Sequence, residues 1–185
     1  DWLILGRTNY RLKNLVPQLR ERGLYFEIKN RKSYNARLYR SIQDYSRWTN
    51  GALLSISECK DLFEFLELDK QLKEERMYDL KEFGFSFTDP WYEVFKAEPE
   101  ECLYIREMMR NEEKLKEDPR IKLSTIHAAK GGEATNILII LDNTKKIREA
   151  IEKNQDKYDE EQRVWYVGVT RTKQNLYIMT AKKEA

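Results

Sequence analysis

A run of apolar residues, NILIIL at Asn136–Leu141, constrains the fold of this chain more than any other stretch. Ile137–Leu141 has no polar side chain at alternate positions, so a strand formed here must be covered on both faces. Four other short apolar runs predict strands, and they lie at Trp2–Gly6, Leu24–Ile28, Ile121–Thr125 and Asn175–Thr180. Helical patterns separate several of these runs. Strands that alternate with helices favour a parallel sheet in an α/β fold.

The predicted helices near the two ends of the chain show apolar residues at helical spacing. The first runs between Leu12 and Leu19, ends near Gly23, and starts late or kinks at Pro17. Further helices are expected at residues 35–48 and 159–171. In the last of these we expect Tyr166, Val167 and Val169 to lie in the core and Trp165 in the core or at the edge of a cleft.

The middle of the chain differs from both ends in charge and in pattern. A net charge of +2 divides into +7 for residues 1–50, −9 for residues 51–119 and +4 for residues 120–185. From Ser57 to Asp118 the sequence predicts charged amphipathic helices and no strand, with Ser57 as an N-cap and a last helix that ends before Pro119. We therefore expect a basic module interrupted by an acidic helical insertion.

Several kinds of catalytic site have no counterpart in the sequence. It contains no glycine-rich phosphate loop, no zinc-ligand spacing and no acidic cluster at the end of a strand. The two cysteines, Cys59 and Cys102, share no metal-ligand spacing and favour a reduced, cytoplasmic setting. No apolar run approaches the roughly 20 residues needed to cross a membrane. The chain thus lacks the parts of a complete nucleotide hydrolase, and we expect no metal site.

Three basic residues stand at predicted strand or helix ends: Arg7, Lys130 and Arg171. Ligands of open α/β sheets collect at the carboxyl ends of strands, where a guanidinium suits a multiply charged phosphate. Each residue also has a simpler interpretation. Arg7 can be a solvated loop residue, and Arg171 a last-turn arginine favoured by the helix dipole. His127, the only histidine, can be a structural hydrogen-bonding group.

A second basic segment, residues 29–48, carries six Lys or Arg and one acid. Four aromatic residues are interleaved with them, and these are Tyr34, Tyr39, Tyr45 and Trp48. Basic and aromatic residues together suit single-stranded nucleic acid, through phosphate neutralisation and base stacking. A helix with a solvated basic face and aromatic core contacts accounts for the segment equally well.

Three stretches in order resemble motifs IV, V and VI of the UvrD/Rep family of superfamily 1A DNA helicases. They are LILGRTNYRLKNLVPQLRERGLYFEI, LSTIHAAKGGEATNILII and DEEQRVWYVGVTRTKQNLYI. The resemblance implies that residues 1–50 and 120–185 form the second RecA-like motor domain, called 2A, a parallel sheet flanked by helices. It implies that residues 51–119 stand where the family carries its 2B insertion, much reduced in size. The first motor domain, with its Walker motifs, is not in this sequence.

The resemblance assigns roles position by position. Arg7 and Arg171 match arginine fingers that reach the γ-phosphate of ATP held by the first motor domain. Lys130, Gly131 and Glu133 match nucleotide-side positions of motif V, with Glu133 near the ribose. Thr125 and His127 match motif V positions that lie toward single-stranded DNA. The sequence departs from the usual motifs at Arg11, Gly132, Ala134 and Thr172.

Together these features predict the 2A domain of an ATP-dependent DNA helicase or translocase. The expected partners are single-stranded DNA and the N-terminal motor domain of the same protein, which would hold ATP and Mg²⁺. The isolated chain is expected to be a monomer without ATPase activity, in the cytoplasm of a bacterial or phage-infected cell and not in a membrane. DNA repair and DNA replication both fit. Two alternatives stay open: a non-catalytic RecA-like module that binds DNA or protein, and part of a RecB-type helicase–nuclease.

Overall fold

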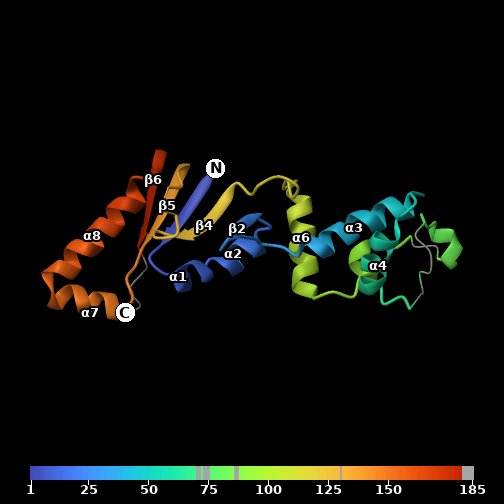
Figure 1. Cartoon of the computed structure of the whole chain (residues 1–185), viewed down its shortest axis with the longest axis horizontal. Coiled ribbons are helices and arrows are strands. Elements are labelled where there is room, and N and C mark those ends of the chain that lie inside the picture. The colour runs from blue at the N-terminus through green and yellow to red at the C-terminus, as the bar shows by residue number, and fades with distance from the viewer. Residues whose placement is uncertain (70–71, 73–75, 86–87, 130, 181–185) are drawn as a thin grey trace. The chain divides into compact units, whose positions relative to one another are not determined.

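The computed structural model describes residues 1–69, 72, 76–85, 88–129 and 131–180. The chain divides into two compact units. The first, here called the sheet unit, comprises residues 1–33 and 112–185, and the second, the helical unit, comprises residues 34–111 (Figure 1). The sequence predicted a different division, into a motor domain at residues 1–50 and 120–185 and an insertion at residues 51–119. That division stays a prediction.

The sheet unit is built on six strands in the order β3-β2-β4-β1-β5-β6 (Figure 1). The strands are β1 Trp2–Gly6, β2 Phe26–Ile28, β3 Arg31–Lys32, β4 Ile121–Thr125, β5 Ala134–Leu141 and β6 Thr172–Thr180. All neighbours pair in parallel except β2 and β3, which pair antiparallel. The α/β class and the mainly parallel sheet predicted from the sequence are confirmed.

Four helices accompany the sheet: α1 Asn9–Lys13, α2 Val16–Glu21, α7 Lys145–Lys153 and α8 Gln155–Val169. The helix expected from Leu12 to Leu19 is two short helices, because Pro17 stands in the first turn of α2. A proline there lacks the N–H needed to continue the hydrogen bonding of a preceding helix, but it starts a new helix well.

The core of the sheet unit lies between α8 and the faces of β1 and β5. Leu5 and Ile137 are fully buried there, and Val164, Trp165 and Val167 of α8 pack against the same cluster. α8 lies close to the strands at Gly168, where an added Cβ atom would make ordinary contacts, at 3.4 Å, with Ile126 Cδ1 and Ile139 Cδ1. Tyr166 and Val169 were expected in the core, but Tyr166 is 69% exposed and Val169 38%. Both lie on the helix face turned away from the sheet.

The outer strand β6 leaves much apolar surface exposed. Leu176, Tyr177, Ile178 and Met179 are all exposed. Tyr177 also stacks on Trp2, with ring centroids 5.3 Å apart. The apolar residues of β6 correctly predicted a strand. In the described part of the chain, however, this strand is not buried.

The helical unit contains α3 Ala36–Thr49, α4 Ile56–Phe65, the short 3-10 helix η1 Leu80–Phe83, α5 Trp91–Val94 and α6 Pro99–Arg110. Two predicted helix ends were wrong. Ser55, not Ser57, caps α4, because its hydroxyl accepts from Glu58 N while the Glu58 carboxylate accepts from Ser55 N. The last helix ends at Arg110 instead of before Pro119. Among the described residues of this unit, β pairing is confined to an isolated bridge between Leu54 and Tyr78.

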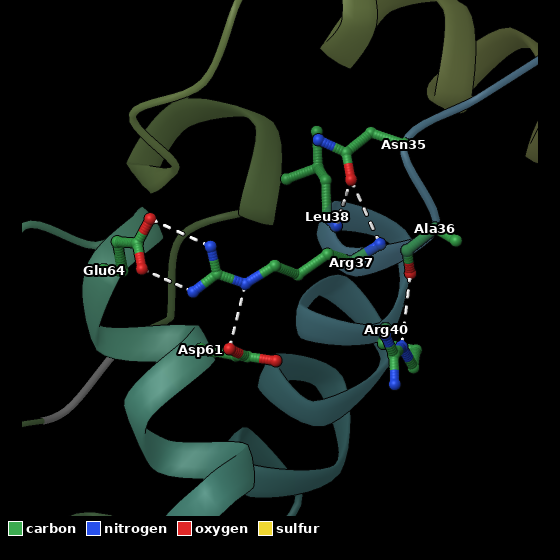
Figure 2. A network of polar contacts seen from close by, with 7 residues as sticks. All are labelled: Asn35, Ala36, Arg37, Leu38, Arg40, Asp61 and Glu64. Atoms are coloured by element: carbon green, nitrogen blue, oxygen red, sulfur yellow. Dashed lines mark hydrogen bonds and ion pairs between the residues drawn. The ribbon is translucent and has the colours of Figure 1, made fainter.

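Much of the basic segment at residues 29–48 lies in α3, where its charges and rings are engaged. Arg37 Nε donates to Asp61 at 2.9 Å and its terminal nitrogens bond to Glu64, which ties α3 to α4 (Figure 2). Tyr45 and Trp48 are buried. Neither ring is available to stack on a base, so the stacking interpretation is wrong for these two residues, and they are core contacts.

Both cysteines are free and buried, and both belong to the helical unit. Burial raises the pKa of the Cys59 thiol to about 11, with a smaller contribution from Glu58. Burial likewise raises the pKa of Cys102. Within the described residues, no helix is long and apolar enough to cross a membrane.

Candidate functional site

The candidate site begins where β1 and β4 end side by side. Gly6 pairs with Thr125, and Ile126 N donates to Gly6 O at 3.1 Å. Gly6 is packed so closely that an added Cβ atom would lie 3.1 Å from Leu12 Cγ. The register therefore places Arg7, which follows β1, beside the turn that follows β4.

Arg7 is held by a buried carboxylate of α8. Its Nε atom donates to Glu161 Oε1 at 2.8 Å and to Oε2 at 3.0 Å. Glu161 is only 5% exposed, whereas the Arg7 side chain is 22% exposed. Among the residues that the structure describes, no partner is found for the two terminal nitrogens of Arg7. Those nitrogens remain available to a ligand.

A cavity of about 470 Å³ lies beside this ion pair. Its lining residues are Arg7, His127, Ile147, Ala150, Ile151, Lys157, Glu160, Glu161, Arg163 and Val164. Lys157 is paired with Glu160 at 2.7 Å, and Arg7 with Glu161. Arg163 carries a further positive charge, so the lining is cationic overall and suits an anion better than a metal ion.

A second cavity, of about 280 Å³, adjoins the first. It is lined by Ile126, His127, Arg163, Val164, Val167 and Arg171, of which His127, Arg163 and Val164 also line the first cavity. Arg171 follows α8, and its Nε donates to Val167 O at 3.2 Å. The structure thus brings Arg7, His127 and Arg171 onto one continuous cationic surface.

A third cavity, of about 630 Å³, shares no lining residue with the other two. Thr125, Gly132 and Glu133 line it, as do the basic residues Lys29, Arg120 and Lys122. Thr125 Oγ1 accepts from Ala128 N at 3.2 Å, and Glu133 lies 3.7 Å from Lys173. Thr125 and Glu133 therefore lie together here, apart from the two arginines, although the resemblance gave them different ligands.

The turn between β4 and β5 contributes described residues to all three cavities: His127 lines the first two, and Gly132 and Glu133 line the third. Gly131 has φ of +87°, a left-handed conformation that side chains rarely adopt. Gly132 N donates to Ala129 O at 2.9 Å and closes the turn. Lys130, the remaining predicted residue, lies outside the described residues.

Sequence reasoning missed Glu161 and Arg163, yet a signal for Glu161 exists. Glu161, Val164, Trp165 and Gly168 recur at helical spacing, so the acid lies on the apolar face of α8. An acid on a buried face needs a cationic partner, because an unpaired buried charge is costly. Within the described part of the chain, no group of three or more His, Cys, Asp or Glu residues is placed to hold a metal ion.

The family described as the UvrD-like helicase C-terminal domain matches residues 25–183. The match runs from just before β2 to just beyond β6 and includes His127, Glu161 and Arg171, while Arg7 precedes it. No curated protein matches the chain.

Proposed function

This chain belongs to the family of UvrD-like helicase C-terminal domains, and from that membership we propose that it is the second motor domain of an ATP-dependent DNA helicase or translocase. In this proposal ATP binds between this domain and a first motor domain of the same protein. Single-stranded DNA runs across both domains. The acidic helical unit stands in place of the family's larger insertion.

One observation carries the proposal: Arg7 and Arg171 line adjoining cavities on one cationic surface. Charge spreads over the oxygens of the transferred phosphoryl group during ATP hydrolysis, and an arginine placed against them stabilises the transition state. Arg7 suits this role because its Nε is bound to Glu161 while its terminal nitrogens are unpartnered among the described residues. A non-catalytic binding module would need no such arrangement.

The remaining assignments are proposals about the two sides of the β4–β5 turn. We assign Lys130, Gly131 and Glu133 to the nucleotide and Thr125 and His127 to DNA. The cavities support a different grouping, with His127 beside the arginines and Glu133 beside Thr125. One turn could therefore contact both ligands, with contacts divided by face instead of by order in the sequence.

Magnesium does not fit the surface around Arg7, whose lining has more cations than anions. We therefore assign Mg²⁺ and the residue that activates water to the first motor domain. The residues of this chain stabilise negative charge and orient the phosphate, and they contribute half of a composite site. The chain alone is accordingly expected to hydrolyse no ATP.

The proposal is tested by ATP hydrolysis of the complete protein, with and without single-stranded DNA. Arg171→Ala is expected to lower kcat by about 10³-fold, the magnitude typical of an arginine finger. Arg148→Ala is the matched control, because Arg148 is an exposed arginine of α7 that lines none of the three cavities. A wild-type protein without DNA-stimulated hydrolysis, or a normal rate for Arg171→Ala, would exclude this function.

A further inference from the structure

The hydrogen bond between Arg7 and Glu161 uses the guanidinium in an unusual way. Arginine commonly meets a carboxylate through two parallel N–H bonds that occupy one edge of its fork. Here both carboxylate oxygens share the Nε–H instead, at 2.8 and 3.0 Å. The carboxylate therefore binds Nε–H alone, and the two terminal nitrogens have no hydrogen-bond partner among the described residues.

Glu161 is well placed to fix an arginine. It lies in the middle of α8, whose next turns pack through Val164 and Trp165 against the core. With 5% exposure it has little room to adopt another rotamer. Arg7, by contrast, follows the end of β1 and reaches the carboxylate across 154 positions of sequence. The rigid element in this pair is the acid, and the side chain being oriented is Arg7.

We propose that Glu161 is a positioning residue, which anchors Nε of Arg7 so that the terminal nitrogens project toward the phosphate of the bound nucleotide. This inference rests on the proposed function, because it concerns how the finger of that function is aimed. A guanidinium can serve two anions at once, since its five N–H donors point along different directions in one plane. Glu161 occupies one of these directions and the nucleotide another.

A purely stabilising ion pair would give a different pattern. Such a pair would contribute to folding, so its loss would lower the melting temperature and the amount of folded protein but leave kcat per folded molecule unchanged. A positioning residue acts through Arg7 alone. Once Arg7 is gone, changing Glu161 should have no further effect on the rate of hydrolysis. The distinguishing observable is therefore kcat per folded molecule, and whether the effect of Glu161 on it vanishes when Arg7 is absent.

Two substitutions separate the charge of Glu161 from its reach. Glu161→Gln keeps the size of the side chain but weakens the bond to Nε, because the carboxylate charge is lost. Glu161→Asp keeps the negative charge, but its side chain is one methylene group shorter, so the carboxylate lies farther from Arg7 Nε. Glu149→Gln is the matched control, because it removes a half-exposed carboxylate of α7 that pairs with Lys145 at 3.8 Å and lines none of the three cavities.

The experiment measures kcat and KM for ATP in the complete protein with single-stranded DNA. We expect Glu161→Gln to lower kcat by about 10²-fold, the cost of a misplaced catalytic group, with KM unchanged. Glu161→Asp should recover part of the rate, and Glu149→Gln should match wild type. In an Arg7→Ala background, Glu161→Gln should cause no further loss. If Glu161→Gln does not fold, the kcat of Glu161→Asp is compared with wild type instead. A wild-type melting temperature then shows that a lower kcat does not come from unfolding.

Three results would overturn the inference. Normal kcat in both Glu161 variants beside an inactive Arg7→Ala variant would remove the positioning role and leave the proposed function intact. An additional loss from Glu161→Gln in the Arg7→Ala background, multiplying the loss from Arg7→Ala, would do the same. Wild-type protein that hydrolyses no ATP, or that is indifferent to Arg7→Ala, would overturn the proposed function and this inference together.

Discussion

Nη2 of Arg11 lies 2.6 Å from Oδ2 of Asp142, and this ion pair ties α1 to the residue that follows β5. The Asp142 side chain is 11% exposed and that of Arg11 31%, so the carboxylate is the more shielded of the two groups. The pair thus helps to hold together the edge of the sheet where Arg7 emerges.

The first prediction concerns this pair. Asp142→Asn and Arg11→Gln should each destabilise the sheet unit, and the double variant should cost less than the sum, with a coupling of about 1–2 kcal/mol. The measurement is a double-mutant cycle by chemical denaturation. Lys13→Gln is the control, since Lys13 is an exposed cation of the same helix. Additive losses would mean that the two side chains do not stabilise each other.

The second prediction contrasts two glycines. Gly6→Ala should lower the free energy of unfolding by about 1–3 kcal/mol, because the new Cβ would lie 3.1 Å from Leu12 Cγ and 3.3 Å from Thr8 O. Gly168→Ala should be neutral or stabilise by up to about 1 kcal/mol, since it favours the helix and makes ordinary contacts at 3.4 Å. Thermal unfolding of both variants checks this. Equal losses would show that α8 has no space for a methyl group.

The third prediction concerns the start of α4. Ser55→Ala should cost about 1 kcal/mol of stability, because it removes the hydroxyl that accepts from Glu58 N. Ser57→Ala should have little effect, although Ser57 is the residue first expected to cap this helix. Denaturant unfolding gives the free energy of unfolding of both variants, in which the same serine-to-alanine change is made two residues apart. A larger loss for Ser57→Ala would contradict the capping geometry.

The fourth prediction follows from the buried thiol of Cys59. Its pKa of about 11 exceeds the ordinary value of 9.0, so only about one thiol in a thousand is ionised at pH 8. Iodoacetamide should therefore label Cys59 at pH 8 only after unfolding, as mass spectrometry of labelled peptides can show. Because the folded state holds this proton more tightly, the stability it contributes is complete below pH 9 and lost as the pH rises toward 11. Rapid labelling of the native protein would refute the burial.

The sequence predicted the central strands well because their signals are local. β4 runs from Ile121 to Thr125 as expected, and β5 contains the apolar run that predicted it. A continuous apolar run is informative about burial when a strand has neighbours on both sides. For β6 the apolar run correctly predicted a strand, but it gave no sign that Leu176 and Ile178 of this outer strand are exposed. Periodicity alone does not tell which strand forms the edge.

The candidate site was harder to predict because it depends on contacts between distant residues. Arg7 and Arg171 were identified from motifs, but nothing local to either one shows that they line adjoining cavities. Glu161 was overlooked since its role requires the partner at Arg7. The start of α4 was misjudged although the sequence holds a local signal: Glu58 follows Ser55 by three residues, the spacing of a capping box, whereas Lys60 stands at that distance from Ser57.

The helical unit has a topological consequence. β2 and β4 are parallel neighbours, with Phe26 paired to Ile121, yet residues 34–111 lie between them in the chain. To the sheet, that whole unit is one crossover loop. The entropy of closing a loop grows only with the logarithm of its length, so that doubling the length costs about 0.6 kcal/mol. The sheet is thus nearly indifferent to the length of its insertion, which leaves evolution free to shrink or enlarge the insertion without rebuilding the sheet.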